Sequence, residues 1–97
     1  MKRGKFITFE GGEATGKSTQ SKRLAERLER AGIPVIVTRE PGGTPVGEDV
    51  RALIMKDRPT DPVTELLLFA AARAEHMTSV IRPALYDGTW VISDRFI

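Results

Sequence analysis

The sequence predicts an α/β fold in which helices flank a parallel β-sheet. Three observations support this prediction. A glycine-rich loop stands between a strand-like run and a segment of helical periodicity, two strand-like runs are joined by that helical segment, and a third hydrophobic run ends in Asp94. Strands that are joined through a helix pair in parallel by a right-handed crossover. With 97 residues, the chain forms one domain at most.

The glycine-rich loop at residues 11–18 reads GGEATGKS and fits the pattern G-x-x-x-x-G-K-[ST] at every fixed position. Glycines let backbone amides approach phosphate oxygens because no Cβ intervenes. Lys17 would add a positive charge at the β- and γ-phosphates, and the hydroxyl of Ser18 would take one Mg²⁺ position. A chance match in a glycine turn is the alternative. The strand before the loop and the helix after it instead favour a P-loop NTPase-type sheet.

The composition excludes several classes of function. The absence of cysteine excludes disulfides, thiolate metal sites and a cysteine nucleophile. The longest unbroken apolar run, residues 66–72, is far shorter than the roughly 18 residues of a membrane helix, and the first residues show no signal-peptide pattern. The net charge is only +2 and acidic and basic residues are interspersed, which argues against a nucleic-acid interface. We therefore expect a cytoplasmic protein that binds neither membranes nor nucleic acid.

The first two helices are predicted from apolar side chains with helical spacing. The first helix, 18–30, is expected to expose its charged residues and to bury Leu24, Ala25, Leu28 and Ala31. Gly32 is expected to end it in a left-handed conformation. A β-branched strand at residues 34–38 follows. A second helix then buries a stripe of Val46, Val50, Leu53 and Ile54, and residues 57–60 end it.

A third helix is expected to begin after Asp61 as N-cap, with Pro62 in its first turn. Its apolar pattern continues to Met77, and Pro83 should kink or end it, although Ala84 and Leu85 could continue the helix briefly. Judged without other information, Phe69 on this helix is a core side chain and Arg73 a surface charge. His76 has no partner that the sequence identifies, and we expect it to be exposed.

Polar residues follow two of the predicted strands at the edge of the sheet where parallel sheets bind ligands. The segment 39–44, REPGGT, follows the second strand, although Pro and two Gly could also form a plain turn. Strand 90–93 delivers Asp94 and Arg95 to the same edge. A hydrophobic strand that ends in Asp resembles a Walker B element, whose carboxylate holds Mg²⁺ directly or through water.

Arginines near this edge indicate the kind of phosphoryl acceptor. Planar guanidinium groups suit phosphate oxygens, and four of them come from the expected strand ends and following helices: Arg39, Arg51, Arg73 and Arg95. The pattern favours an acceptor that is itself a phosphate. Two alternatives stay open. Glu40 could serve as the base of a nucleoside kinase, whose acceptor is a hydroxyl, or the chain could bind nucleotide without transferring phosphate.

Four segments together closely resemble bacterial thymidylate kinase: residues 9–19, 38–44, 68–73 and 91–96. The resemblance implies that ATP phosphorylates dTMP to dTDP, with Mg²⁺, in dTTP biosynthesis. Lys17 and Arg95 would be the catalytic residues, and Ser18 and Asp94 would hold the metal ion. The residues expected to bind ATP are Gly11, Gly12, Glu13, Ala14, Thr15, Gly16, Lys17, Ser18 and Thr19.

The resemblance also implies a dTMP site. The aromatic ring that matches Phe69 stacks on thymine, and the arginine that matches Arg73 hydrogen-bonds the base, so both would serve a ligand. Arg95 would bind the dTMP phosphate, Arg51 would line the same nucleotide, and Glu13 would approach the sugar 3′-hydroxyl. The residues expected to bind dTMP are Glu13, Arg39, Glu40, Pro41, Arg51, Phe69, Arg73 and Arg95.

In one respect the sequence departs from part of the family. Some members carry an arginine within the phosphate loop where this chain has Ala14, and in the other subtype the arginines come from a mobile lid over ATP. Such a lid would lie beyond Ile97. We therefore expect residues 1–97 to be the N-terminal portion of a single nucleoside monophosphate kinase domain, truncated after the third strand. The resemblance also implies a homodimer in the full-length form.

Overall fold

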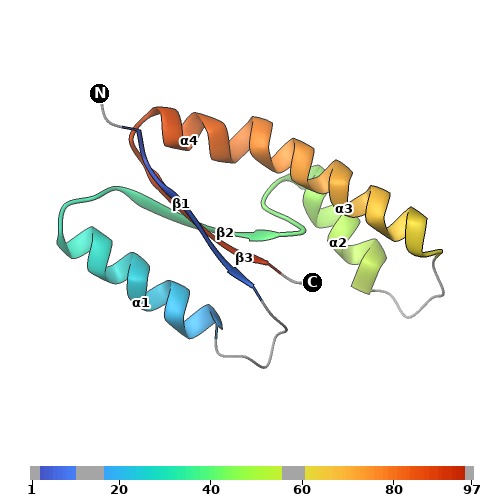
Figure 1. Cartoon of the computed structure of the whole chain (residues 1–97), viewed down its shortest axis with the longest axis horizontal. Coiled ribbons are helices and arrows are strands. Elements are labelled where there is room, and N and C mark those ends of the chain that lie inside the picture. The colour runs from blue at the N-terminus through green and yellow to red at the C-terminus, as the bar shows by residue number, and fades with distance from the viewer. Residues whose placement is uncertain (1–2, 11–16, 56–60, 96–97) are drawn as a thin grey trace.

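The structure is a computed structural model that describes residues 3–10, 17–55 and 61–95. Strands and helices alternate as the sequence predicts (Figure 1). The elements are β1 (Phe6–Glu10), α1 (Lys17–Arg30), β2 (Val35–Glu40), α2 (Pro45–Met55), α3 (Pro62–His76), the π-helical turn η2 (Met77–Ile81), α4 (Arg82–Tyr86) and β3 (Trp90–Arg95). Helices lie on both faces of the sheet, with α1 on one face and α3 to α4 on the other.

The three strands form one parallel sheet in the order β1-β3-β2, which confirms the predicted fold class. The last strand in the chain is therefore the central one. Because helices cover both of its faces, consecutive residues of β3 are buried, and Val91, Ile92 and Ser93 have no exposed surface. The register places Glu10 and Glu40 on either side of Arg95, so the three carboxyl ends are level.

Helix α1 packs on one face of the sheet through a small core. Ala25 and Leu28 contact Ile92 of the central strand, and a rim of partly buried side chains surrounds them: Phe9, Leu24, Ile33, Val35 and Trp90. The prediction that α1 buries Ala25 and Leu28 is confirmed, but the prediction that Ala31 is buried is wrong. Ala31 is exposed because the helix has already ended at Arg30, and the buried face instead extends back to Ser21.

The turn and the strand that follow α1 are both present, but the strand ends later than predicted. Gly32 has the expected left-handed backbone, with φ of +79°. Strand β2 continues to Glu40 rather than ending near Thr38. Arg39 and Glu40 belong to the strand because they pair with Asp94 and Arg95 of β3, which lie more than fifty residues later in the chain.

Helix α2 buries Val50 of the predicted stripe but leaves Val46 and Leu53 exposed. Gly47 and Val50 are its buried residues, whereas Val46 and Leu53 are 48% and 41% exposed. The reason is a close backbone approach at Gly47: a Cβ there would lie 2.6 Å from the carbonyl oxygen of Gly42. The helix therefore turns its glycine, rather than its largest apolar side chains, toward the preceding loop.

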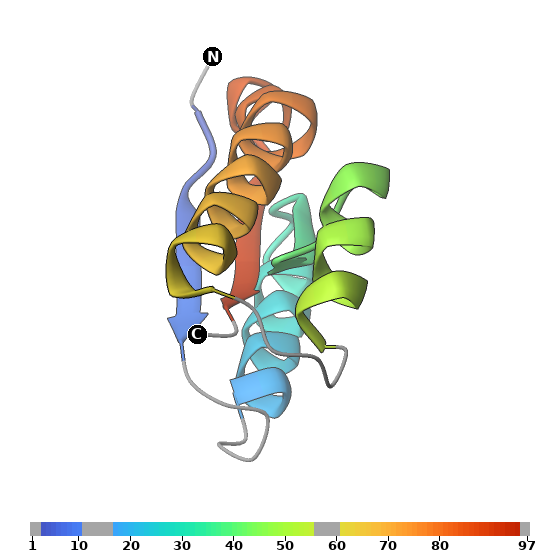
Figure 2. The ribbon, with the colours of Figure 1, turned by 90° about the vertical axis from the view of Figure 1, so that its right-hand side faces the viewer.

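The last helical segment begins as expected and continues past the proline. Asp61 caps α3 by accepting hydrogen bonds from the amides of Val63 and Thr64 at 3.0 and 3.2 Å. The π-helical turn η2 precedes α4, and Pro83 lies in the first turn of α4, where a missing N–H is tolerated. Figure 2 shows α2 beside α3. In the described ranges, no helix is both long and apolar enough to cross a bilayer.

Candidate functional site

The level strand ends bring the predicted site segments to one edge of the sheet. The phosphate-loop sequence follows Glu10 in the chain, and Glu10 ends β1 next to the end of the central strand β3. Its residues 11–16 (Gly11, Gly12, Glu13, Ala14, Thr15 and Gly16) lie outside the described residues, as do the side chains of Lys17, Ser18 and Arg95. The backbones of Lys17 and Ser18 form the first turn of α1, and Thr19 is exposed in that turn.

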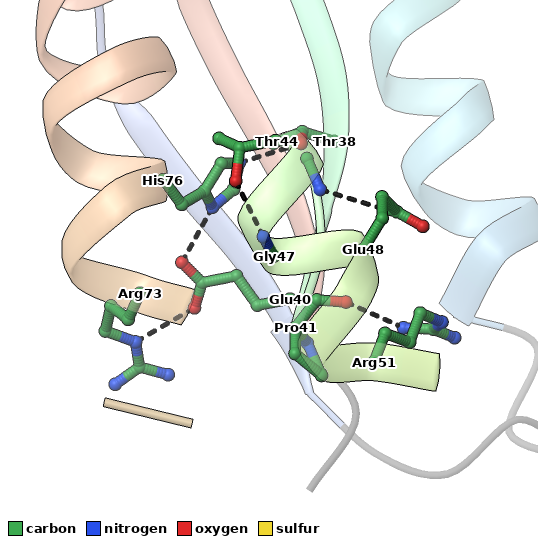
Figure 3. Close-up of polar contacts among 10 residues, drawn as sticks. Thr38, Glu40, Pro41, Thr44, Gly47, Glu48, Arg51, Arg73 and His76 are labelled. Carbon is green, nitrogen blue, oxygen red and sulfur yellow. Dashed lines mark hydrogen bonds and ion pairs between the residues drawn. The ribbon is translucent and has the colours of Figure 1, made fainter. Parts of the chain in front are cut away.

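Glu40 is the centre of the described part of the site (Figure 3). Its buried carboxylate accepts a hydrogen bond from Arg73 Nε at 2.9 Å on one oxygen, and from His76 Nδ1 at 2.8 Å on the other. The second ring nitrogen of His76, Nε2, lies 2.8 Å from the hydroxyl of Thr38. Side chains of α3 are thereby joined to the end of β2.

These contacts keep Glu40 ionised. Burial by itself would raise the pKa of the Glu40 carboxyl, but the hydrogen bond from His76 and the positive charge of Arg73 outweigh it and hold the pKa below its usual value of 4.5. A carboxylate with a lowered pKa and a donor on each oxygen is a strong anchor for cations and a weak proton acceptor.

His76 is the site residue that the sequence analysis missed. We predicted an exposed histidine, but the imidazole has no exposed surface. The correction has a physical reason: its partners on β2 lie 36 and 38 residues earlier in the chain, and only the tertiary fold brings them near. The available signal was spacing, since His76 is three residues after Arg73 and so lies on the same side of α3.

The loop after β2 is held by a second set of contacts. Arg39 Nε donates to Glu48 Oε2 at 3.2 Å, and the same carboxylate accepts from the Gly43 amide at 2.9 Å. The bond to Arg39 and the bond from Gly43 lower the pKa of Glu48. Arg51 donates to the carbonyl oxygen of Pro41 at 3.1 Å. Arg39 and Arg51 therefore help to shape the loop from within this chain.

The remaining described candidates lie near the same edge. Phe69 is partly buried one helical turn before Arg73 on α3. In β3, one carboxylate oxygen of Asp94 and the hydroxyl of Ser93 are buried, and neither has a hydrogen-bond partner in the described ranges. A buried carboxylate oxygen without a donor is suited to a cation.

The described residues hold no cluster of three or more His, Cys, Asp and Glu that could bind a metal ion. Mg²⁺ that travels with a nucleotide needs only one or two protein ligands, because phosphates and water complete its coordination. The orphan oxygen of Asp94 therefore fits the expected Mg²⁺, with the hydroxyl of Ser18 as the other predicted ligand.

The sequence profile described as thymidylate kinase matches residues 9–97. The chain belongs to the thymidylate kinase family. Among curated thymidylate kinases, the one from Bradyrhizobium diazoefficiens is 56% identical over 96 residues, and the one from Marinomonas sp. is 54% identical over 97 residues. These alignments cover 97% and 98% of this chain but 42% and 46% of the relatives, so the chain spans less than half of their length.

A solved structure agrees with the family membership. The crystal structure of thymidylate kinase from Ehrlichia chaffeensis is 48% identical and superimposes with a TM-score of 0.87, covering 97% of this chain and 55% of that chain. The resemblance seen in the sequence is thus confirmed at the level of family, and this chain has the P-loop NTPase-type fold.

Proposed function

We propose that this chain supplies the phosphate-binding loop and the acceptor site of a dTMP kinase, which transfers the γ-phosphoryl group of ATP to dTMP in dTTP biosynthesis. The observation that best supports this proposal is that the carboxyl ends of β1, β2 and β3 lie at the same level of the sheet. They bring Glu10, which directly precedes the loop sequence, to the same edge as Asp94 and the Glu40–Arg73 pair, which supports a site where a donor and an acceptor phosphate meet. The homologues' name supports the assignment of the reaction.

The acceptor would be held by cations that come from separate elements. Arg73 from α3 and Arg51 from α2 are anchored through Glu40 and Pro41, and Arg95 ends the central strand. Guanidinium groups suit both phosphate oxygens and the carbonyl edge of a pyrimidine. Under this proposal Phe69 stacks on the thymine and Arg73 bonds its edge, while Arg95 binds the phosphate.

On the donor side, Lys17 would neutralise charge at the β- and γ-phosphates. Asp94 and Ser18 would hold Mg²⁺, which supplies further charge neutralisation on the phosphate oxygens when it is bound. The whole enzyme would act as a homodimer, as the family resemblance implies, and in the cytoplasm, as the composition suggests. The remaining length of the relatives would provide the adenine contacts and the lid.

The environment of Glu40 argues against the nucleoside-kinase alternative. A general base should be able to take a proton at the working pH, but the Glu40 pKa is lowered and both oxygens already accept hydrogen bonds. A phosphate acceptor is already an anion and needs no base. Assays with ATP and either thymidine or dTMP as the acceptor distinguish a nucleoside kinase from a dTMP kinase. Phosphorylation of thymidine but not of dTMP would reject the proposal. Nucleotide binding without turnover of either acceptor would favour the non-catalytic alternative.

The proposed thymine contact is tested in the full-length gene product that contains this chain. Arg73→Ala should raise the dTMP KM by at least about tenfold, because it removes a hydrogen bond to a charged group worth roughly 1.5–3 kcal/mol, and it should leave the ATP KM nearly unchanged. Arg82→Ala is the matched control, since Arg82 is exposed further along the same helical segment. Equal losses for both nucleotides would contradict the assignment.

A further inference from the structure

We propose that His76 is a positioning residue for the nucleoside monophosphate: it fixes the carboxylate of Glu40, and Glu40 in turn holds Arg73 in the orientation that receives the base. We call the Thr38, Glu40, Arg73 and His76 set the histidine clasp. The inference rests on the proposed function for the identity of the ligand, but the clasp itself stands on contacts within this chain.

The imidazole is held on both sides by one face of β2. Thr38 and Glu40 are two residues apart on that strand, so their side chains leave the same face of the sheet. The Thr38 hydroxyl lies 2.8 Å from Nε2 of His76, and a carboxylate oxygen of Glu40 lies 2.8 Å from Nδ1. The imidazole ring has no exposed surface. A carboxylate can only accept, so Nδ1 carries a proton. A hydroxyl can donate or accept, so Thr38 satisfies Nε2 in either charge state of the ring.

The two carboxylate oxygens of Glu40 bond different side chains. Oε2 is bonded to the buried histidine, which stops the carboxylate from rotating, and Oε1 then points at Nε of Arg73. The Arg73 side chain is 47% exposed, whereas that of Glu40 is 4% exposed. The arginine is thus anchored at its inner nitrogen, and no described residue bonds to its outer nitrogens, which leaves them available to a ligand.

Such an anchor acts on binding rather than on the transfer step. A half-exposed arginine samples many rotamers, and ordering it when a ligand binds costs affinity. The clasp orders the guanidinium before the ligand arrives. Losing His76 should therefore weaken binding of the monophosphate and leave the ATP site, which lies on the phosphate loop, unaffected.

Two amide variants separate the role of each ring nitrogen. In His76→Asn the amide branches from Cγ, as Nδ1 does, so it can still donate to Glu40. In His76→Gln the amide reaches one atom further, where Nε2 lies, and can satisfy only Thr38. We expect His76→Gln to raise the Kd for dTMP about tenfold, and His76→Asn to raise it less than about threefold, with the ATP Kd unchanged in both.

The measurement is titration calorimetry with dTMP and with ATP on the full-length gene product, together with kcat. Glu75→Gln is the control, because Glu75 is the neighbouring residue on α3 and bonds only the exposed Ser79 among the contacts described. Equal loss of dTMP affinity in the Asn and Gln variants would overturn the proposal, since cavity formation alone would then explain it. A matching loss of ATP affinity would overturn it as well.

A ligand-free measurement on the wild-type protein tests the clasp when a variant does not fold or when dTMP is not the substrate. Proton exchange at Arg73 Nε–H, followed by NMR, should be at least about tenfold slower than at the exposed Arg82, because a charge-assisted bond must open first. Exchange as fast as that of Arg82 would reject the clasp. Slow exchange with no binding of dTMP would retain the clasp and reject the proposed function instead.

Discussion

Gly43 and Gly32 form a matched pair that isolates the packing around the histidine clasp. Both have a left-handed backbone, with φ of +80° and +79°. An added Cβ at Gly32 would meet nothing within 4 Å, whereas one at Gly43 would lie 2.5 Å from His76 Nε2 and 2.6 Å from Thr38 Oγ1. The two alanine substitutions should therefore have the same free-energy cost from the left-handed backbone, and only Gly43→Ala should add a cost from steric overlap.

The size of each effect follows from these contacts. Alanine in a left-handed conformation costs roughly 1–2 kcal/mol, so Gly32→Ala should lower the free energy of unfolding by about that amount. Gly43→Ala should add the cost of moving well-packed groups, roughly 1–3 kcal/mol. His76 cannot give way cheaply because it is fully buried and bonded at both ring nitrogens. We expect a total of about 3 kcal/mol for Gly43→Ala.

Urea unfolding of the full-length gene product measures both variants, and dTMP titration measures the site. Gly43→Ala should also weaken dTMP binding, since it displaces the ring that holds Glu40, whereas Gly32→Ala lies at the end of α1 and should not. Equal destabilisation by the two substitutions would contradict this prediction, because the clash with His76 would then contribute nothing.

Three further outcomes are expected. Lys17→Ala should lower kcat at least about 100-fold with an unchanged circular dichroism spectrum, since the ammonium stabilises developing phosphate charge; normal turnover would reject the phosphate-loop mechanism. Asp61→Ala should lower the free energy of unfolding in urea by about 1 kcal/mol, because the amides of Val63 and Thr64 lose their acceptor; an unchanged midpoint would show that the cap is dispensable. The pKa of Glu40 is lowered from 4.5, so its stabilisation is complete above that value and is lost as pH falls through the folded-state value. Unfolding free energy should thus fall more steeply below pH 4.5 in the wild type than in Glu40→Gln, and parallel profiles would contradict this.

Features that depend on neighbouring residues were predicted well. The Asp61 cap and the left-handed Gly32 are both present, and the centre of the α1 core face is right. Each depends on contacts within a few residues, where spacing and side-chain type are sufficient. The strand that carries Asp94 is present for the same reason, since its motif is contiguous in the chain, whereas the phosphate loop stays a prediction because residues 11–16 lie outside the described ranges.

Features that depend on distant partners were predicted poorly. Strand β2 ends two residues later than expected because β3 offers partners for Arg39 and Glu40. In α2 the close approach of Gly47 to the Gly42 carbonyl leaves Val46 and Leu53 of the predicted stripe exposed, and only its Val50 is buried as expected. His76 was expected at the surface although it is fully buried.

The amino-acid sequence alone indicates the chemistry that this chain can offer: a phosphate-loop motif, an acidic residue at a strand end and several arginines, in the order that identifies the family. The three-dimensional fold determines which of these groups contact one another. It put β3 between β1 and β2, levelled their carboxyl ends and closed α3 onto β2 through Glu40 and His76. The physical reason is that a buried ion network is satisfied by partners far apart in the chain, and local periodicity carries no information about them.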